Sequence, residues 1–205
     1  MKELLKKIQE LKNSEIKKTI DSRIKEFEEI GKDPEKIFQE LCFCILTANY
    51  NAKRAIKIQD KINDFSTLSK ETLSKKLNEL GHRFPNKRAE YICLASQKKK
   101  ELLKVLDSLS GKELREWLVD NIKGLGYKES SHFLRNIGYK NLAIIDFHIV
   151  DLLVSHGLIE KPKTLTKKKY LEIEEVLQKI AKKANLTLAE LDLYLWYIET
   201  GKILK

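Results

Sequence analysis

The chain has 205 residues, of which 34% are charged and 42% hydrophobic, and its formal net charge is +10. This length and composition can support a buried core, which excludes a disordered tail. No apolar run approaches the roughly 20 residues that span a bilayer, and the N-terminus has no secretory signal pattern. We therefore expect a cytoplasmic protein that makes no contact with membranes.

Helical spacing of apolar residues runs through the chain, and strand-like alternation is nearly absent, which predicts an all-α fold. Asp33-Pro34 is a typical helix start, with proline in the first turn. In chain order, the helices singled out by this pattern cover residues 14–29, 34–45, 73–80, 87–104, 110–122, 128–137 and 187–200.

Two of these helices are predicted to begin with a capping box, in which a Ser or Thr and a Glu three positions later satisfy each other's backbone amides. The boxes are Ser110-x-x-Glu113 and Thr187-x-x-Glu190. Residues 160–168 are interpreted as a solvated connection.

The basic charge suits a polyanionic partner, because phosphates neutralised by Lys and Arg release counterions. Lysine-rich chains are also typical of proteins that work at high temperature, so charge alone leaves both interpretations open. The three cysteines, Cys42, Cys44 and Cys93, cannot all pair with one another. We interpret them as buried thiols and expect neither a disulfide framework nor a zinc site.

The most informative stretch is the break between two helices at Lys123-Gly124-Leu125-Gly126-Tyr127. Two glycines allow a tight turn and bring backbone N–H groups to the surface. Together with the N-terminus of the following helix, these donors form an anion site suited to a DNA phosphate. An ordinary αα-hairpin is the alternative. The apolar residues in register with Leu125 favour the phosphate site.

The segment Ile122–Lys128, followed by Asp146, resembles the helix-hairpin-helix glycosylase superfamily. Together with further stretches across nearly the whole chain, it resembles the compact archaeal-type 8-oxoguanine DNA glycosylase/lyase family. The resemblance implies an enzyme of base-excision repair that flips 8-oxoguanine out of duplex DNA, excises it and cleaves the abasic site by β-elimination. The further stretches that carry the resemblance are Leu46–Asn49, Gly81–Phe84, Ser131–Asn136, Ala143–Asp146 and Trp196–Lys205.

The resemblance also implies a two-lobed helical fold with its active site in the cleft between the lobes. We expect residues 36–137 to form the lobe that carries the hairpin, and residues 1–35 and 138–205 to form the other. The expected partner is double-stranded DNA containing 8-oxoguanine, bound by a monomer. No cofactor is expected, although a monovalent cation at the hairpin backbone is compatible with the resemblance.

Lys128 and Asp146 are the candidate catalytic residues. A lyase needs an amine that attacks C1′ and forms a Schiff base, and a helix N-terminus disfavours the charged ammonium form of a lysine such as Lys128. Asp146 ends an apolar run and is also a natural helix N-cap. A fixed carboxylate at this position can stabilise the cationic sugar or help to move protons.

Four residues are candidates for the pocket that holds the flipped base. His132 lies one helical turn after Lys128 and can face the same side. Trp196 offers a ring for stacking a purine, and Asp192 can accept hydrogen bonds from its N–H edge. The α-carboxylate or the ammonium of Lys205 is expected to read the base. The alternative for His132 is an ordinary surface or core position, and the alternative for Trp196 is a place in the core.

The remaining candidates contact DNA. Asn49 is expected to fill the space left by the flipped nucleotide, and Phe84 to act as an apolar wedge at the opposite strand; a helix C-cap and a core position are the alternatives. Gly124 and Gly126 present the hairpin amides, and His148 is a further predicted contact. Two departures from the family stand out: the loop at Gly138 has no proline, and Phe147 replaces an expected arginine.

Three other functions are compatible with parts of this pattern. A non-enzymatic helix-hairpin-helix module explains the hairpin and the charge, but not Lys128 and Asp146 together. A glycosylase of the same fold acting on oxidised pyrimidines or mispaired adenine commonly carries a four-cysteine iron–sulfur site near its C-terminus, and this chain has no cysteine after Cys93. A helical transcription regulator needs a base-reading recognition helix, which the sequence does not show.

Overall fold

The computed structural model describes residues 1–62 and 64–204. Within these residues the chain forms twelve α-helices and no β-strand, which confirms the predicted all-α class. The helices are α1 Lys2–Lys12, α2 Ile16–Ile30, α3 Pro34–Thr47, α4 Ala52–Lys61, α5 Lys70–Glu79, α6 Pro85–Gln97, α7 Lys99–Ser108, α8 Gly111–Asn121, α9 Tyr127–Asn136, α10 Phe147–Ser155, α11 Lys167–Ala184 and α12 Leu188–Thr200. None of them is long and apolar enough to cross a membrane.

The chain divides into two compact units. The chain-ends unit comprises Met1–Glu29 and Leu134–Lys205, and the middle unit comprises Ile30–Phe133. These bounds lie a few residues from the lobes expected from the sequence, and the division into functional lobes stays a prediction.

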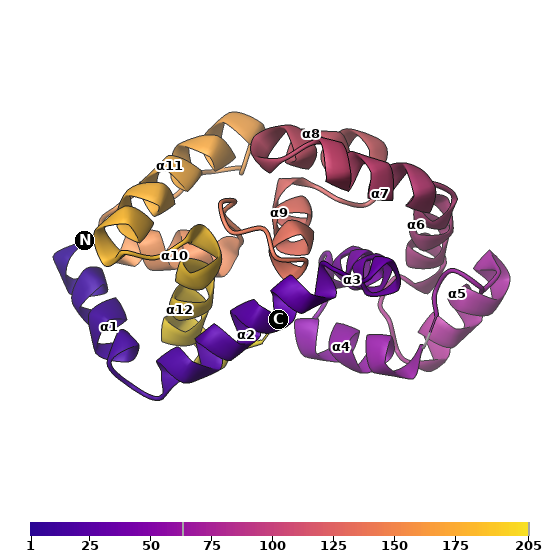
Figure 1. The fold of residues 1–205 in the computed structure, drawn as a ribbon, viewed down its shortest axis with the longest axis horizontal. Coiled ribbons are helices and arrows are strands. Elements are labelled where there is room, and N and C mark those ends of the chain that lie inside the picture. Colours follow the sequence, from indigo (N-terminus) through magenta and orange to yellow (C-terminus); the bar gives the residue numbers. More distant parts are fainter. Residues whose placement is uncertain (63, 205) are drawn as a thin grey trace. The chain divides into compact units, whose positions relative to one another are not determined.

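The core of the chain-ends unit forms where the first and last helices meet. Helix α1 lies beside α11 and also contacts α12, while α10 packs against α12 (Figure 1). Apolar residues of the first helix, Leu4 and Ile8, are fully buried in this core. The two ends of the sequence therefore fold into one body, which also carries α10 and the loop that leads to it.

Helix α3 is the centre of the middle unit and packs against α4 and α6 (Figure 1). It is apolar on nearly all sides, and every residue from Leu41 to Thr47 is buried, as expected for a helix surrounded by others. Its start is the predicted one: the Asp33 carboxylate accepts hydrogen bonds from the backbone N–H of Glu35 at 2.9 Å and of Lys36 at 3.3 Å.

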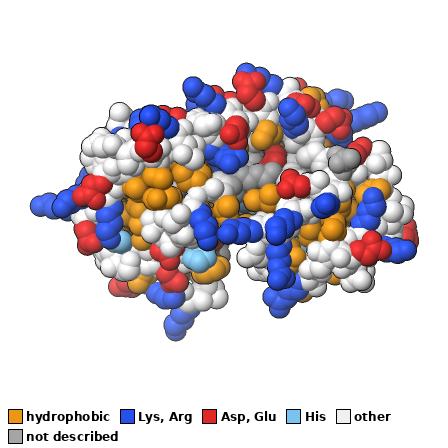
Figure 2. Space-filling view, turned by 90° about the horizontal axis from the view of Figure 1, so that it is seen from below, with side chains coloured by type: hydrophobic (Ala, Val, Ile, Leu, Met, Phe, Trp, Pro, Cys, Tyr) orange, Lys and Arg blue, Asp and Glu red, His pale blue; other side chains and the backbone are white. Residues whose placement is uncertain are grey.

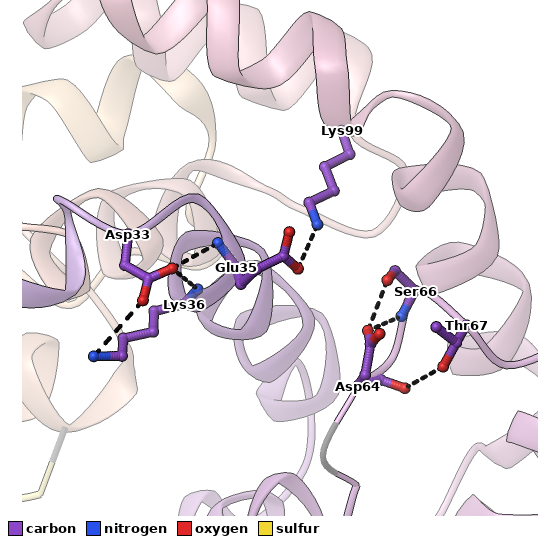
Figure 3. A network of polar contacts seen from close by, with 7 residues as sticks. All are labelled: Asp33, Glu35, Lys36, Asp64, Ser66, Thr67 and Lys99. Atoms are coloured by element: carbon purple, nitrogen blue, oxygen red, sulfur yellow. Dashed lines mark hydrogen bonds and ion pairs between the residues drawn. The ribbon is translucent and has the colours of Figure 1, made fainter.

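Polar contacts fix the beginning of α3 against α7 (Figure 3). Lys99, the first residue of α7, donates to Glu35 at 2.6 Å, and its ammonium lies 5.2 Å from the centre of the Phe38 ring. Nearby, the Asp64 carboxylate accepts from the Ser66 amide at 2.8 Å and from its hydroxyl at 2.7 Å. The hydrogen bonds from Ser66 hold the pKa of Asp64 below its usual range.

Three local predictions were wrong. The single helix expected over residues 87–104 is two helices, because the Lys98 amide bonds to Ala95 three residues back while its carbonyl starts α7; no Gly or Pro marks this break. Ser110 precedes α8 but its side chain makes no capping bond, since Gly111 follows with a φ of +54° and turns the backbone away. Cys93 is partly exposed, whereas the other two free thiols are buried.

Other local predictions are confirmed. The second capping box is complete, with the Glu190 amide donating to the Thr187 hydroxyl at 3.2 Å and the Thr187 amide to the Glu190 carboxylate at 2.7 Å. The structure adds four helices that the periodicity did not single out, α1, α4, α10 and α11, and α10 begins after the cap expected at Asp146. Residues 160–165 are irregular and mostly exposed, as expected for a solvated connection.

Candidate active site

The predicted hairpin joins α8 and α9 in the middle unit. Its apolar residues Ile122 and Leu125 are both buried, and the Leu125 amide donates to the Ile122 carbonyl at 3.2 Å. At the second glycine, the Gly126 amide donates to the Glu129 carboxylate at 3.3 Å and its carbonyl accepts from Ser130. The protein's own carboxylate thus binds one of the amides predicted to hold a phosphate.

Gly124 is required at the turn for two separate reasons. Its φ is +95°, a conformation that residues with a side chain rarely adopt. A Cβ atom added here would also lie 2.5 Å from Cδ2 of Tyr91, inside the ring's contact distance. Tyr91 belongs to α6, so the first glycine lets the hairpin pack closely on that helix.

Gly124→Ala is expected to lower the free energy of unfolding by about 1–3 kcal/mol, because it combines an unfavourable φ with the clash against Tyr91. Gly126→Ala is the matched control. Its Cβ would meet only the flexible Glu129 carboxylate, at 3.3 Å, so we expect a loss below about 1 kcal/mol. Urea denaturation of both variants measures the difference, and equal losses would contradict this account of the turn.

Lys128 lies in the first turn of α9, directly after the hairpin, and is half-buried. Within residues 1–62 and 64–204 its ammonium makes no hydrogen bond or ion pair. The position of Lys128 is therefore set by the helix backbone and not by a polar partner. Its side-chain nitrogen is available for chemistry.

A buried polar frame holds the turn that carries Lys128. The Arg115 side chain is completely buried, donates to the Ser131 hydroxyl at 3.2 Å and lies 5.2 Å from the centre of the Tyr127 ring. The Tyr127 hydroxyl in turn donates to the Glu116 carboxylate. These contacts join α8 to the first two turns of α9. One turn further on, His132 is buried edge-on against Phe43 of α3, with ring centres 5.7 Å apart.

Asp146 is the N-cap of α10 in the chain-ends unit, as predicted. Its Oδ1 accepts a hydrogen bond from the Ile149 amide at 3.0 Å, and the carboxylate is half-buried. No contact of Oδ2 is seen in the described part of the chain. One carboxylate oxygen is thus used for capping, which leaves the other for a ligand.

Two buried residues of α11 fix the extended segment that leads to Asp146. The Glu174 carboxylate accepts from the Ala143 amide at 2.9 Å. The Tyr170 hydroxyl donates to the Ala143 carbonyl at 2.7 Å and accepts from the Ile145 amide at 3.2 Å. Sequence reasoning missed both residues, because a Glu and a Tyr on a helical stripe carry no signal of a distant backbone partner.

An aromatic group lies where α10 meets α12. The His148 ring stands edge-on to Trp196 at 5.2 Å, and its Nδ1 is 3.8 Å from the Glu199 carboxylate. The Trp196 indole nitrogen is buried and has no hydrogen-bond partner within residues 1–62 and 64–204. Phe147, stacked on His148 at 4.0 Å, is 68% exposed. This group brings together two of the predicted site residues and places an exposed aromatic ring beside Asp146.

Asp192 of α12 pairs with a buried arginine at the end of α9. The Asp192 carboxylate lies 3.4 Å from the Arg135 guanidinium, and both side chains are largely buried. Arg135 also lies 4.6 Å from the centre of the Phe27 ring. Asp192 is therefore engaged by an internal cation, and its role toward a base stays a prediction. Lys205 lies outside the described residues.

The two predicted insertion residues are both exposed, in the middle unit. Asn49 follows the end of α3 with a φ of +54°, a conformation that Asn tolerates better than most residues. Phe84 is 38% exposed at the start of α6, with the Arg83 guanidinium 4.9 Å from its ring centre. Figure 2 shows Lys and Arg side chains spread over one face of the molecule among exposed hydrophobic ones. The core alternative for Phe84 does not hold, since its ring reaches solvent.

His82, in the loop before Phe84, is 4% exposed and binds on both sides of its ring. Its Nε2 lies 3.0 Å from the Leu46 carbonyl, and its Nδ1 lies 3.0 Å from the Phe84 amide. A carbonyl only accepts and an amide only donates, so the ring is neutral with its proton on Nε2. Burial lowers the pKa of His82, and the nearby Arg88 guanidinium lowers it further.

We expect His82 to make stability depend on pH. The lowered pKa means that the unfolded chain takes up this proton more readily than the folded protein, so the free energy of unfolding falls as the pH drops below about 6.5. His82→Asn removes the titration. In urea denaturation between pH 8 and pH 5, the free energy of unfolding of the wild type should fall toward, or below, that of this variant as the pH falls. A difference in the free energy of unfolding that stays constant with pH would contradict the lowered pKa of His82.

Among the described residues, no group of three His, Cys, Asp or Glu side chains is arranged to hold a metal ion. The middle unit contains the hairpin, Lys128, His132, Asn49 and Phe84. The chain-ends unit holds Asp146, His148, Trp196 and Asp192.

Comparison with known proteins gives a consistent result. Residues 20–186 match the family described as 8-oxoguanine DNA glycosylase. The 8-oxoguanine DNA glycosylase/AP lyase of Korarchaeum cryptofilum is 50% identical over 99% of this chain and 98% of its own. The Methanocaldococcus jannaschii 8-oxoguanine glycosylase/lyase, solved with a 15mer DNA containing 8-oxoguanine, is 56% identical over 98% of this chain and 99% of its own, with a TM-score of 0.95. The Thermotoga maritima 8-oxoguanine DNA glycosylase is 43% identical over 100% and 99%, with a TM-score of 0.93.

The helical fold and its hairpin define a helix-hairpin-helix DNA glycosylase. Within that class, the chain belongs to the 8-oxoguanine DNA glycosylase family.

Proposed function

We propose that the protein excises 8-oxoguanine from double-stranded DNA and then cleaves the strand at the resulting abasic site. The observation that carries the proposal is the placement of Lys128, half-buried directly after the glycine hairpin and with no polar partner in the described chain. Its relatives from Korarchaeum cryptofilum and Methanocaldococcus jannaschii, which share half or more of its residues, bear the names of this activity.

In the proposed reaction the nucleotide is first flipped out of the stack, because its glycosidic bond is inaccessible inside a duplex. The Lys128 amine attacks C1′ and expels the base, which takes up the proton that the amine loses. Opening of the sugar ring gives a Schiff base between C1′ and the amine nitrogen. Loss of a proton from C2′ then expels the 3′-phosphate, and hydrolysis of the remaining imine frees Lys128.

We assign Asp146 the role of stabilising positive charge on the sugar as the base departs. Its Oδ1 is held by the Ile149 amide, and the segment before it is bound to α11, so the carboxylate is fixed before substrate arrives. A charge that is already oriented stabilises a transition state without a cost of reorganisation. The Oδ2 atom is the one assigned to the sugar.

The base and the DNA backbone are assigned to the other predicted residues. The Trp196 indole offers a ring face and a buried N–H for a purine, and His148 beside it is assigned to DNA. His132 remains a proposed pocket residue. At the hairpin, the backbone amides around Gly124 and Gly126 are assigned to a phosphate, a role that requires the Glu129 carboxylate to leave the Gly126 amide.

Base release from a panel of duplexes tests the proposed function. The panel has four duplexes: the first contains 8-oxoguanine, the second an oxidised pyrimidine, the third adenine opposite 8-oxoguanine, and the fourth no lesion. We expect the 8-oxoguanine duplex to lose its base and to be cleaved, and borohydride to trap a covalent complex. Faster release of an oxidised pyrimidine or of mispaired adenine would identify a glycosylase of the same fold with that base as its substrate. Binding without base release would identify a non-enzymatic DNA-binding module.

A further inference from the structure

Two loops of the middle unit, residues 46–50 and 81–84, are tied together by polar contacts and form what we call the insertion platform. Three hydrogen bonds join them or brace them. The His82 ring reaches the Leu46 carbonyl at 3.0 Å, and the Tyr50 hydroxyl donates to the Gly81 carbonyl at 2.9 Å. The Arg88 guanidinium, from the first turns of α6, donates to the Ala48 carbonyl.

Polar contacts flank both predicted insertion residues. Before Asn49, the Ala48 carbonyl accepts from Arg88. After it, the Tyr50 amide donates to the Thr47 carbonyl at 3.0 Å, and the Tyr50 side chain is bound to Gly81. Phe84 is held through its own amide, which donates to His82 Nδ1 at 3.0 Å. The exposed side chains of Asn49 and Phe84 thus project from backbone that is fixed, and one imidazole contacts both loops.

Stacking strengthens the same connection. The Tyr50 ring lies on the His82 ring, with centres 4.1 Å apart and planes inclined by 34°. The Arg88 guanidinium is 5.8 Å from the centre of the Phe84 ring and is itself buried. These groups belong to the segment after α3, to the loop before α6 and to α6 itself, so the platform is built from elements that are distant in sequence but packed in one unit.

We propose that His82 is a positioning residue that couples the two loops, so that Asn49 and Phe84 enter damaged DNA as one rigid device. The proposal rests on the proposed function, since it needs a duplex opened at a lesion. Two independently mobile loops would each lose conformational freedom on insertion. Contacts that already fix the two loops remove most of that backbone cost before DNA is bound, which is the advantage of a preorganised site.

Two substitutions of His82 by amide residues each keep one of the two hydrogen bonds of the imidazole and remove the other. His82→Asn places an oxygen near the position of Nδ1 and keeps an acceptor for the Phe84 amide, but cannot reach Leu46. His82→Gln places an amide nitrogen near the position of Nε2 and keeps the bond to Leu46. Tyr50→Phe removes only the hydroxyl bond to Gly81 and keeps the stacked ring.

The test measures the dissociation constant for a duplex with a tetrahydrofuran abasic analogue, in the wild-type background and in Asn49→Ala/Phe84→Ala. If His82 acts through Asn49 and Phe84, its effect must vanish when both are truncated. We expect His82→Asn to weaken binding about tenfold in the wild-type background and less than about twofold in the truncated one. His82→Gln should stay within about threefold of wild type. Tyr50→Phe, which leaves the core intact, should weaken binding less than His82→Asn does in the wild-type background. Its effect should likewise disappear in the truncated background.

His156→Asn, a histidine change at the C-cap of α10 and outside the residues assigned to DNA or to catalysis, is the control and should leave binding unchanged. The proposal would be overturned if His82→Asn weakened binding by the same factor in both backgrounds, and Tyr50→Phe did likewise. The proposed function is tested separately by borohydride trapping of the wild type. If borohydride traps the wild-type adduct but the effects of the His82 and Tyr50 variants on binding do not depend on the background, only the platform proposal is refuted. If those effects depend on the background but no adduct is trapped, only the proposed lyase activity is refuted.

Discussion

Lys128→Gln is expected to abolish the covalent complex that borohydride traps with 8-oxoguanine DNA, while duplex binding stays within about threefold of wild type. Glutamine has nearly the same length but its amide nitrogen cannot attack C1′ or form a Schiff base. Because Lys128 makes no polar contact within residues 1–62 and 64–204, its replacement should not disturb the fold. Denaturing gel electrophoresis after borohydride treatment measures the adduct.

Lys123→Gln is the matched control for this change. Lys123 lies five positions earlier in the hairpin and is exposed, so its variant should still form the adduct. A normal adduct with Lys128→Gln would remove Lys128 from the reaction. Loss of the adduct in both variants would indicate that charge at the hairpin, rather than a nucleophile, is what matters.

Asp146→Asn is expected to lower the single-turnover rate of 8-oxoguanine release by about a hundredfold or more. Asparagine still caps a helix well, so the bond to the Ile149 amide and the start of α10 should survive. The variant therefore separates the charge of the carboxylate from its structural role. Thermal unfolding and duplex affinity should stay close to those of the wild type.

Asp151→Asn is the control on the same helix. Asp151 is exposed on α10 and pairs with Lys161 at 2.6 Å, an arrangement that contributes little to stability. Its variant should excise 8-oxoguanine within about twofold of the wild-type rate. An unchanged rate with Asp146→Asn would reduce Asp146 to a helix cap.

The parts of the fold that follow from local chemistry were predicted from the sequence. The start of α3 at Asp33, the complete box at Thr187 and the cap at Asp146 each depend on residues within one turn. The hairpin was predictable for the same reason. Ser110 shows the limit of such signals, because it precedes a left-handed Gly111 and its side chain makes no capping bond.

The contacts that hold the candidate catalytic residues in place could not be predicted, because their partners are distant in sequence. Arg115 braces the turn of Lys128 from α8, and Glu174 holds the segment before Asp146 from 31 positions away. In the sequence both are charged residues on amphipathic helices, where a solvated position is the usual one. Only tertiary packing buries them and gives them backbone or hydroxyl partners.

We propose that this chain cleaves DNA through Lys128 as a covalent nucleophile. Peptide mapping of the borohydride-reduced complex with an 8-oxoguanine duplex, by mass spectrometry, identifies the residue that attacks C1′. We expect a deoxyribose-derived mass on the peptide that contains Lys128, and on no other lysine. A reduced adduct on a different lysine or on the N-terminal amine, or 8-oxoguanine release with no adduct, would contradict it.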